Sequence, residues 1–120
     1  MKKIFSLICC LFMFGCAHQE VFLNGQYVLQ TDTNINIMFE GNNFAGSSGV
    51  NRYFGTYAVD ANKIQINLAG STMMMGPQDL MTAEQKYMTT LAKVTKLKLG
   101  KNRLILYVNS TDYLLFEKVK

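Results

Sequence analysis

Alternation of apolar and polar residues with a period of two is the feature that most restricts the fold of this chain. In the segments 35–40 and 63–68, apolar residues such as Ile37 and Ile66 alternate with mostly polar ones. Successive side chains of a strand point to opposite faces, so this pattern predicts half-buried antiparallel strands. Further strands are predicted at residues 26–31, 53–59, 95–99, 104–108 and 113–118. Turns rich in Gly, Asn and Asp separate them, which favours a meander.

Only one segment has the period of a helix. Apolar residues recur at steps of three and four between Asp79 and Val94. Thr82 with Gln85 three residues later has the pattern of a capping box, from which the helix can start. Many strands with one late helix predict a mainly β fold. We expect a strongly curved antiparallel sheet that forms a small, closed or nearly closed β-barrel, with the helix packed on one end or side.

The amino terminus has the composition of an export signal. Lys2 and Lys3 precede an apolar run, residues 4–14, that is too short to span a membrane and that ends at Gly15 and Cys16. A small residue before a cysteine is what the lipoprotein signal peptidase prefers. The sequence therefore predicts a signal peptide at 1–15, lipidation of Cys16, a short tether at 16–22 and one domain at 23–119. An ordinary secretory signal cleaved nearby is the alternative.

Cysteine content and charge narrow the class of protein further. Cys9 and Cys10 lie in the predicted signal, which leaves only Cys16 in the exported chain, so the domain must be held by packing without a disulfide. The formal net charge of +4 includes the two leader lysines and is too small to predict binding to nucleic acid. Basic residues concentrate from Lys86 onward. This cationic face is either a solvated surface that protects strand edges or a site for anionic lipid or polysaccharide.

Two motifs in order resemble the META domain, also called the HslJ-like or DUF306-type family. The first runs from Gly49 to Tyr57 and contains the pair Asn51 and Arg52, and the second is a Thr-Met-Met segment before the helix. The resemblance implies that structural or binding roles fall on Gly49, Asn51, Arg52, Tyr53, Gly55, Tyr57, Thr72 and Met74. It also implies a small barrel-like β fold with a helix, often in an envelope lipoprotein. Some members are linked to stress tolerance, and no enzymatic activity is established for the family.

Two cysteine positions of the family are changed in this chain. Many relatives carry one cysteine before the Asn-Arg pair and another just after the Met segment, at positions that are Val50 and Gly76 here. If those cysteines pair in relatives, packing must hold the two loops together in this chain.

The candidate sites each have two interpretations. Arg52 could bind an anion with its planar fork of donors, or could join Asn51 in tying the strand connection to the Met segment through backbone bonds. The run 73–75, with Met81 and Met88 downstream, could offer thioethers to Cu(I) or could fill gaps between sheet and helix. The sole histidine, His18, adjoins the lipid anchor, and the serines lack a visible base. We therefore expect no catalytic residue, no cofactor and no metal site.

The sequence favours a non-enzymatic, monomeric lipoprotein in the cell envelope, at the outer membrane and facing the periplasm. Its expected partners are the membrane, through the lipid anchor, and an envelope protein or an anionic lipid or polysaccharide. A rival hypothesis is an inhibitor of lysozyme or another enzyme. That hypothesis rests on a loop with Ser48, Gly49, Arg52 and Tyr53. The mildly basic charge argues against it, because lysozymes are usually cationic and steering would be lost.

Overall fold

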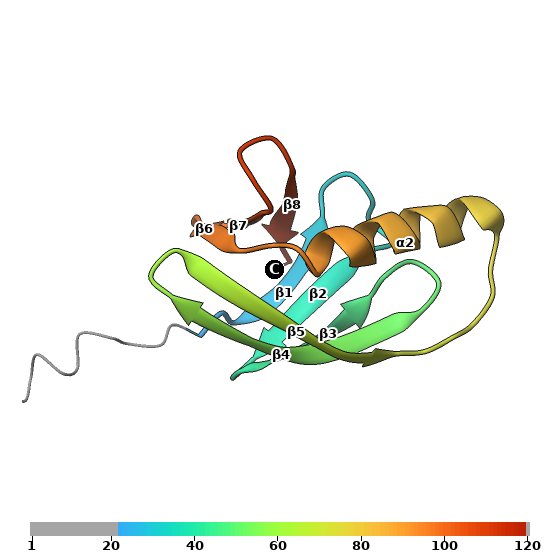
Figure 1. Cartoon of the computed structure of the whole chain (residues 1–120), viewed down its shortest axis with the longest axis horizontal. Coiled ribbons are helices and arrows are strands. Elements are labelled where there is room, and N and C mark those ends of the chain that lie inside the picture. The colour runs from blue at the N-terminus through green and yellow to red at the C-terminus, as the bar shows by residue number, and fades with distance from the viewer. Residues whose placement is uncertain (1–21, 120) are drawn as a thin grey trace, which may run out of the picture.

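The computed structural model describes residues 22–119 (Figure 1). The predicted signal peptide, the lipidation site Cys16 and His18 lie outside the described residues. Within the described part of the chain, no helix has the length and apolar composition needed to cross a bilayer.

Eight strands and one helix are formed between residues 22 and 119. The strands are β1 (Gly25–Leu29), β2 (Asn36–Glu40), β3 (Asn43–Ser47), β4 (Arg52–Asp60), β5 (Lys63–Ser71), β6 (Lys96–Leu99), β7 (Arg103–Tyr107) and β8 (Tyr113–Lys118). The helix α2 (Gln78–Leu91) lies between β5 and β6 in the chain. Each strand pairs antiparallel with the next, and β8 pairs with β1, so the sheet closes into a ring. The predicted fold class, mainly β with one helix and a strongly curved antiparallel sheet, is confirmed.

The ring has one weak junction, between β5 and β6. These two strands share a single registered pair, Lys63 with Lys96, whereas β4 and β5 pair along almost their whole length. Helix α2 leads from the end of β5 to the start of β6, and its buried side chains Tyr87 and Leu91 join the core. The helix thus links the two strands of this junction in the chain and packs its apolar side chains into the core, where Tyr87 meets Tyr53 of β4 and Phe116 of β8.

Strand β3 was not predicted, because its composition does not look like a strand. The segment reads Asn-Phe-Ala-Gly-Ser, and small and polar residues are poor strand formers. It pairs nevertheless with both β2 and β4, and Phe44 and Gly46 point inward. A Cβ on Gly46 would lie 2.1 Å from the backbone oxygen of Asn36. Only glycine fits there, because any side chain would overlap the backbone of the neighbouring strand.

Helix α2 begins earlier than its predicted capping box. Pro77 occupies the N-cap position and makes no side-chain cap hydrogen bond. Thr82 lies inside the helix, where its hydroxyl donates to the backbone oxygen of Gln78 at 2.9 Å. The capping-box prediction for Thr82 and Gln85 is therefore wrong.

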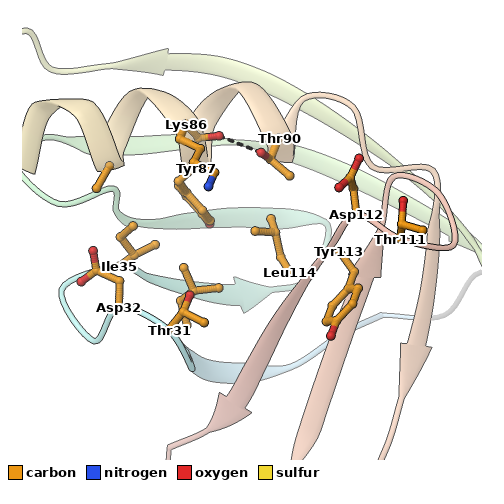
Figure 2. A pocket seen from close by; sticks show the side chains of 12 residues that line it. Thr31, Asp32, Ile35, Lys86, Tyr87, Thr90, Thr111, Asp112, Tyr113 and Leu114 are labelled. Carbon is orange, nitrogen blue, oxygen red and sulfur yellow. Dashed lines mark hydrogen bonds between the residues drawn. The ribbon is translucent and has the colours of Figure 1, made fainter.

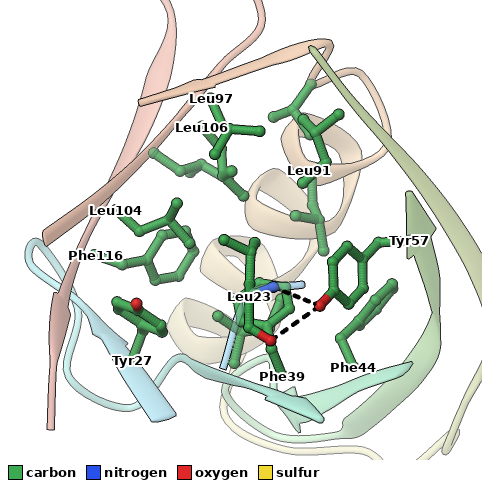
Figure 3. Packing of buried hydrophobic residues seen from close by; sticks show 14 of the residues in the cluster. Leu23, Tyr27, Phe39, Phe44, Tyr57, Leu91, Leu97, Leu104, Leu106 and Phe116 are labelled. Atoms are coloured by element: carbon green, nitrogen blue, oxygen red, sulfur yellow. Dashed lines mark hydrogen bonds between the residues drawn. The ribbon is translucent and has the colours of Figure 1, made fainter. Parts of the chain in front are cut away.

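Aromatic and aliphatic side chains from all around the ring fill its interior (Figure 3). Phe39 meets Tyr57 edge to face with ring centroids 5.1 Å apart, and Tyr87 meets Phe116 in the same manner at 6.3 Å. Leu23, which precedes β1, lies in the centre of this cluster. Each such side chain contributes about 1.5–3 kcal/mol when fully buried. Packing of this extent explains how the domain can dispense with a disulfide.

Candidate functional site

A buried carboxylate on α2 organises the motif segment. Glu84 is only 8 % exposed and faces the connection between β3 and β4. Its Oε1 accepts hydrogen bonds from the Ser48 hydroxyl at 2.7 Å and from the backbone N–H groups of Val50 at 3.1 Å and Asn51 at 2.7 Å. Its Oε2 accepts from Nδ2 of Asn51 at 2.7 Å. Four donors from one loop thus converge on one carboxylate.

These hydrogen bonds keep Glu84 charged. Burial alone would raise the pKa of Glu84, but the side-chain donors of Asn51 and Ser48 and the backbone donors of Asn51 and Val50 outweigh burial, and the pKa lies below its ordinary value. Hydrogen bonds to a charged acceptor are stronger than those between neutral groups. The charged carboxylate is therefore the form that stabilises the loop.

Asn51 extends this cluster to the Met segment. Its Oδ1 accepts from the Thr72 hydroxyl at 2.8 Å and from the backbone N–H of Met74 at 2.5 Å. Its Nδ2 donates to the backbone oxygen of Met74 at 3.1 Å as well as to Glu84. One amide side chain therefore joins helix α2, the β3–β4 connection and the Met segment.

Arg52 contributes to this junction only through its backbone. Its N–H donates to the Thr72 hydroxyl at 3.0 Å, and its carbonyl accepts from the Thr72 N–H at 2.9 Å. The Arg52 side chain is exposed at the start of β4. The guanidinium is thus free to meet solvent or a partner, while the loop geometry depends on the neighbouring asparagine.

The two motif tyrosines lie inside the ring. Tyr53 donates to the backbone oxygen of Asn36 at 2.8 Å and shares a short hydrogen bond with the hydroxyl of Tyr87. Burial raises the pKa of both these hydroxyls above the ordinary value. The hydroxyl of Tyr57 accepts from the Leu23 N–H at 2.8 Å and lies 2.6 Å from the carbonyl oxygen of Gly41. These contacts fix the helix and the N-terminal segment to the barrel.

The Met segment is exposed, contrary to one interpretation of the sequence. Met73 and Met75 are 88 % and 86 % exposed, and Met74 is 53 % exposed. These three do not fill gaps between sheet and helix, so that interpretation is wrong for the run 73–75, whereas Met88 does pack against the core. The segment forms the loop from β5 to α2 on the outside of the domain (Figure 1).

Val50 and Gly76, the two positions at which the family resemblance implies cysteines in relatives, lie in contact. A Cβ on Gly76 would be 3.4 Å from Cβ of Val50 and 2.7 Å from its Cγ2. The first distance is close to the range of 3.5–4.5 Å that a disulfide requires. Valine over glycine therefore occupies the space that two cysteines would use.

Glu84 is the residue that sequence reasoning missed. Its carboxylate lies beside the hydroxyl of Ser48, and the sequence does not reveal this pair. Ser48 is 1 % exposed, so no substrate can reach its hydroxyl. Among residues 22–119, no three His, Cys, Asp or Glu side chains come together as metal ligands. The missed signal was the position of Glu84 three and seven residues before Tyr87 and Leu91, on the apolar stripe of the helix.

A groove of about 610 Å³ lies at the other side of α2 (Figure 2). Apolar side chains such as Leu114 and Ile35 line it together with Tyr87. Asp32, Asp112 and Lys86 supply charges of both signs. The motif residues of the β3–β4 connection do not line this groove, so groove and motif are separate features.

The ring of eight antiparallel strands, with one helix fastened to the β3–β4 connection by a buried carboxylate, defines a small barrel-like domain. The chain belongs to the META domain family, whose pattern matches residues 17–120. The solved structures that resemble it include an NMR structure of a protein from Burkholderia xenovorans, with a TM-score of 0.66 and 21% identity over 80% of this chain and 82% of that one.

A second similar structure is the crystal structure of a DUF4847 family protein from Bacteroides vulgatus. Its TM-score is 0.58, with 20% identity over 70% of this chain and 58% of that chain. At this level of identity the likeness shows the fold alone. No curated protein matches the chain.

Glu84→Gln tests the buried carboxylate. Because the amide has one acceptor and points its NH₂ at donors, we expect the free energy of unfolding to fall by about 3 kcal/mol at pH 7. The folded pKa is lowered, so the stabilisation is present above pH 4.5 and is lost as the pH falls through the folded value. The difference between wild type and variant should therefore shrink at acidic pH.

Urea unfolding monitored by circular dichroism between pH 3 and pH 7 measures this difference. Glu40→Gln, at the exposed end of β2, is the matched control and should change stability by less than about 0.5 kcal/mol. An equal loss in both variants, or a difference that grows on acidification, would contradict the assigned role of Glu84.

Val50→Cys with Gly76→Cys tests the contact between the two loops. In the chain from residue 17 onward, which lacks other cysteines, the pair should oxidise to a disulfide and stabilise the domain by about 2–4 kcal/mol relative to its reduced form. Thiol titration and the melting temperature with and without reductant measure this. Gly76→Ala is the control and should destabilise, because its Cβ meets the Val50 side chain. Failure of the double variant to oxidise would show that the loops are not in contact.

Proposed function

We propose that this chain is a non-enzymatic lipoprotein of the bacterial cell envelope. In this proposal it is exported, lipidated at Cys16 and held at the outer membrane, facing the periplasm. Its META domain acts as a monomer, without a cofactor, by binding another envelope component, and it helps to maintain the envelope under stress.

The observation that carries the proposal is that the buried polar groups are hydrogen-bonded within the fold. Among residues 22–119, every buried side-chain nitrogen and oxygen has a hydrogen-bond partner. Glu84 and Asn51, the groups best suited to chemistry, are occupied by one another and by the loops they join. A catalytic site normally presents a perturbed group to a cleft, whereas Glu84 is turned inward. Surface contact is the function that such an arrangement supports.

The surface best suited to contact is the Met segment. Met73, Met74 and Met75 are exposed, while Asn51 fixes the backbone at Met74 on both sides. Methionine side chains are flexible and apolar, and they adapt to partner surfaces. Apolar side chains held out on a fixed backbone favour a protein partner over a soluble ion.

The buried state of the motif loop disfavours the inhibitor hypothesis. Ser48 and Tyr53 are each 1 % exposed and bonded inside the domain, so neither can enter the active site of a partner enzyme. Arg52 alone remains exposed. A lysozyme assay with residues 17–120 should show no inhibition at micromolar protein. Half-inhibition below that concentration would favour the inhibitor hypothesis over the proposed binding role.

Two cellular measurements test the proposal. Cells grown with labelled palmitate should incorporate label into the wild-type chain and none into Cys16→Ser. Crosslinking in cells should then give an adduct with an envelope protein, and Met73→Ser with Met75→Ser should reduce its yield severalfold. Met38→Ser is the matched control, since Met38 is 45 % exposed on β2 and lies outside the segment.

If the wild-type protein incorporates no labelled palmitate, the lipoprotein assignment is wrong. An adduct yield that falls equally in the Met38 control would remove the Met segment as the contact surface. Turnover of a substrate by purified protein would overturn the non-enzymatic assignment.

A further inference from the structure

The N-terminal segment enters the barrel at one defined place. Leu23 is 1 % exposed, and both its N–H and its carbonyl oxygen contact the hydroxyl of Tyr57, at 2.8 and 3.0 Å (Figure 3). The same hydroxyl lies 2.6 Å from the Gly41 carbonyl, in the β2–β3 turn. The chain before β1 is therefore fastened to the end of the barrel that holds the start of β1, and we call this the tether end.

The tether end exposes apolar side chains close to where the chain enters. Phe22 is 56 % exposed, Leu99 at the end of β6 is 49 % exposed, and Val119 after β8 is 42 % exposed. Val119 donates its N–H to the carbonyl of Gln26 at 2.8 Å, so it lies beside β1. Exposed apolar side chains at the strand ends of one face of the barrel are stabilised when they insert into a bilayer interface.

Basic residues lie at the same strand ends as these apolar residues, and Lys98 and Lys118 directly precede Leu99 and Val119 in the chain. Lys98, Lys101 and Arg103 lie on β6, its turn and β7, and all are exposed. Lys118, at the end of β8, has its Cε 3.0 Å from the position of a Cβ on Gly25, so its stem crosses the start of β1. Backbone bonding of Lys118 to Asn102, at 2.9 Å, holds β8 against the β6–β7 turn.

The charge is uneven around the tether end. Glu117 lines a hollow of about 340 Å³ with Lys101 and Arg103. Glu40 and Asp60 end β2 and β4, on the other half of the ring. The β6–β7 turn and the end of β8 therefore form the cationic half, and an anionic surface would meet this half first. Figure 1 shows β6 and β7 on the side from which β1 starts, away from the N-terminal end of α2.

We propose that the tether end, through Phe22, Leu99, Lys98, Lys101, Lys118 and Val119, docks on the anionic lipid surface in which the chain is anchored. This inference rests on the proposed anchoring at Cys16. Phe22 lies six positions after Cys16, and an extended chain spans at most about 3.3–3.6 Å per residue, so Phe22 stays within about 22 Å of the anchor.

A lipid surface fits this end better than a soluble polyanion does. The basic groups alone would suit a polysaccharide, but the exposed Phe22 and Leu99 would remain in water there. An interface accepts apolar side chains and attracts lysines together. Docking at this end also turns the Met segment, which follows β5 at the far end of the barrel, away from the membrane.

The test uses residues 16–120, in which Cys16 is the single thiol, coupled through it to a maleimide lipid in vesicles. The chemical anchor makes the result independent of whether cells lipidate the protein. Amide hydrogen exchange is followed in residues 98–103 and 117–119. We expect exchange there to slow at least tenfold on vesicles with 30% phosphatidylglycerol relative to pure phosphatidylcholine, and the effect to disappear at 0.5 M salt.

Lys98→Glu with Lys101→Glu should abolish the slowing, because each basic group near an anionic surface strengthens attraction about fivefold and reversal adds repulsion. Arg52→Glu with Lys86→Glu changes the charge equally away from the tether end and should retain it. Melting temperatures of both variants check folding. Equal exchange on both vesicles, equal loss in both variants, or slowing by soluble dextran sulfate but not by vesicles would overturn the proposal.

Discussion

The hydrogen bonds between Glu84 and the β3–β4 connection are the interaction on which the rest of this structure depends. A buried carboxylate is costly unless donors surround it, and here four donors from one short loop do so. The same loop holds the Met segment through Asn51. Helix α2, the β3–β4 connection and the Met segment are therefore held in one fixed arrangement, because moving any of them would leave the charge of Glu84 unpaired in the interior.

This cluster explains how the domain does without a disulfide. The two loops are in contact at Val50 and Gly76, without a covalent link. The hydrogen bonds of Glu84 and Asn51 fix the relative positions of the loops, as a covalent link would. Packing of the ring interior supplies most of the stability. The weak β5–β6 junction is tolerable because α2, attached at Glu84, contributes Tyr87 and Leu91 to the same core.

The sequence predicted the architecture better than it predicted the site. Period-two segments such as β2 and β5 were recognisable because burial on one face dictates their residues. Strand β3 was not, since its neighbours impose the strand on a segment with weak propensity. The helix start was misplaced at Thr82 because a local pattern cannot show that Pro77 already begins the turn. Glu84 was missed because its donors come from residues 33 to 36 positions away.

The domain has two distinct ends, one where the chain enters beside Leu23 and one where the Met segment is displayed. Display of the Met segment in one conformation requires that Asn51 and Glu84 fix the loop. Native-state hydrogen exchange at the amides of Asn51 and Met74 measures this directly. Both should exchange as slowly as the amides paired within β4. Rapid exchange at Met74, while β4 stays protected, would contradict this, because it would show that the buried cluster does not hold the loop.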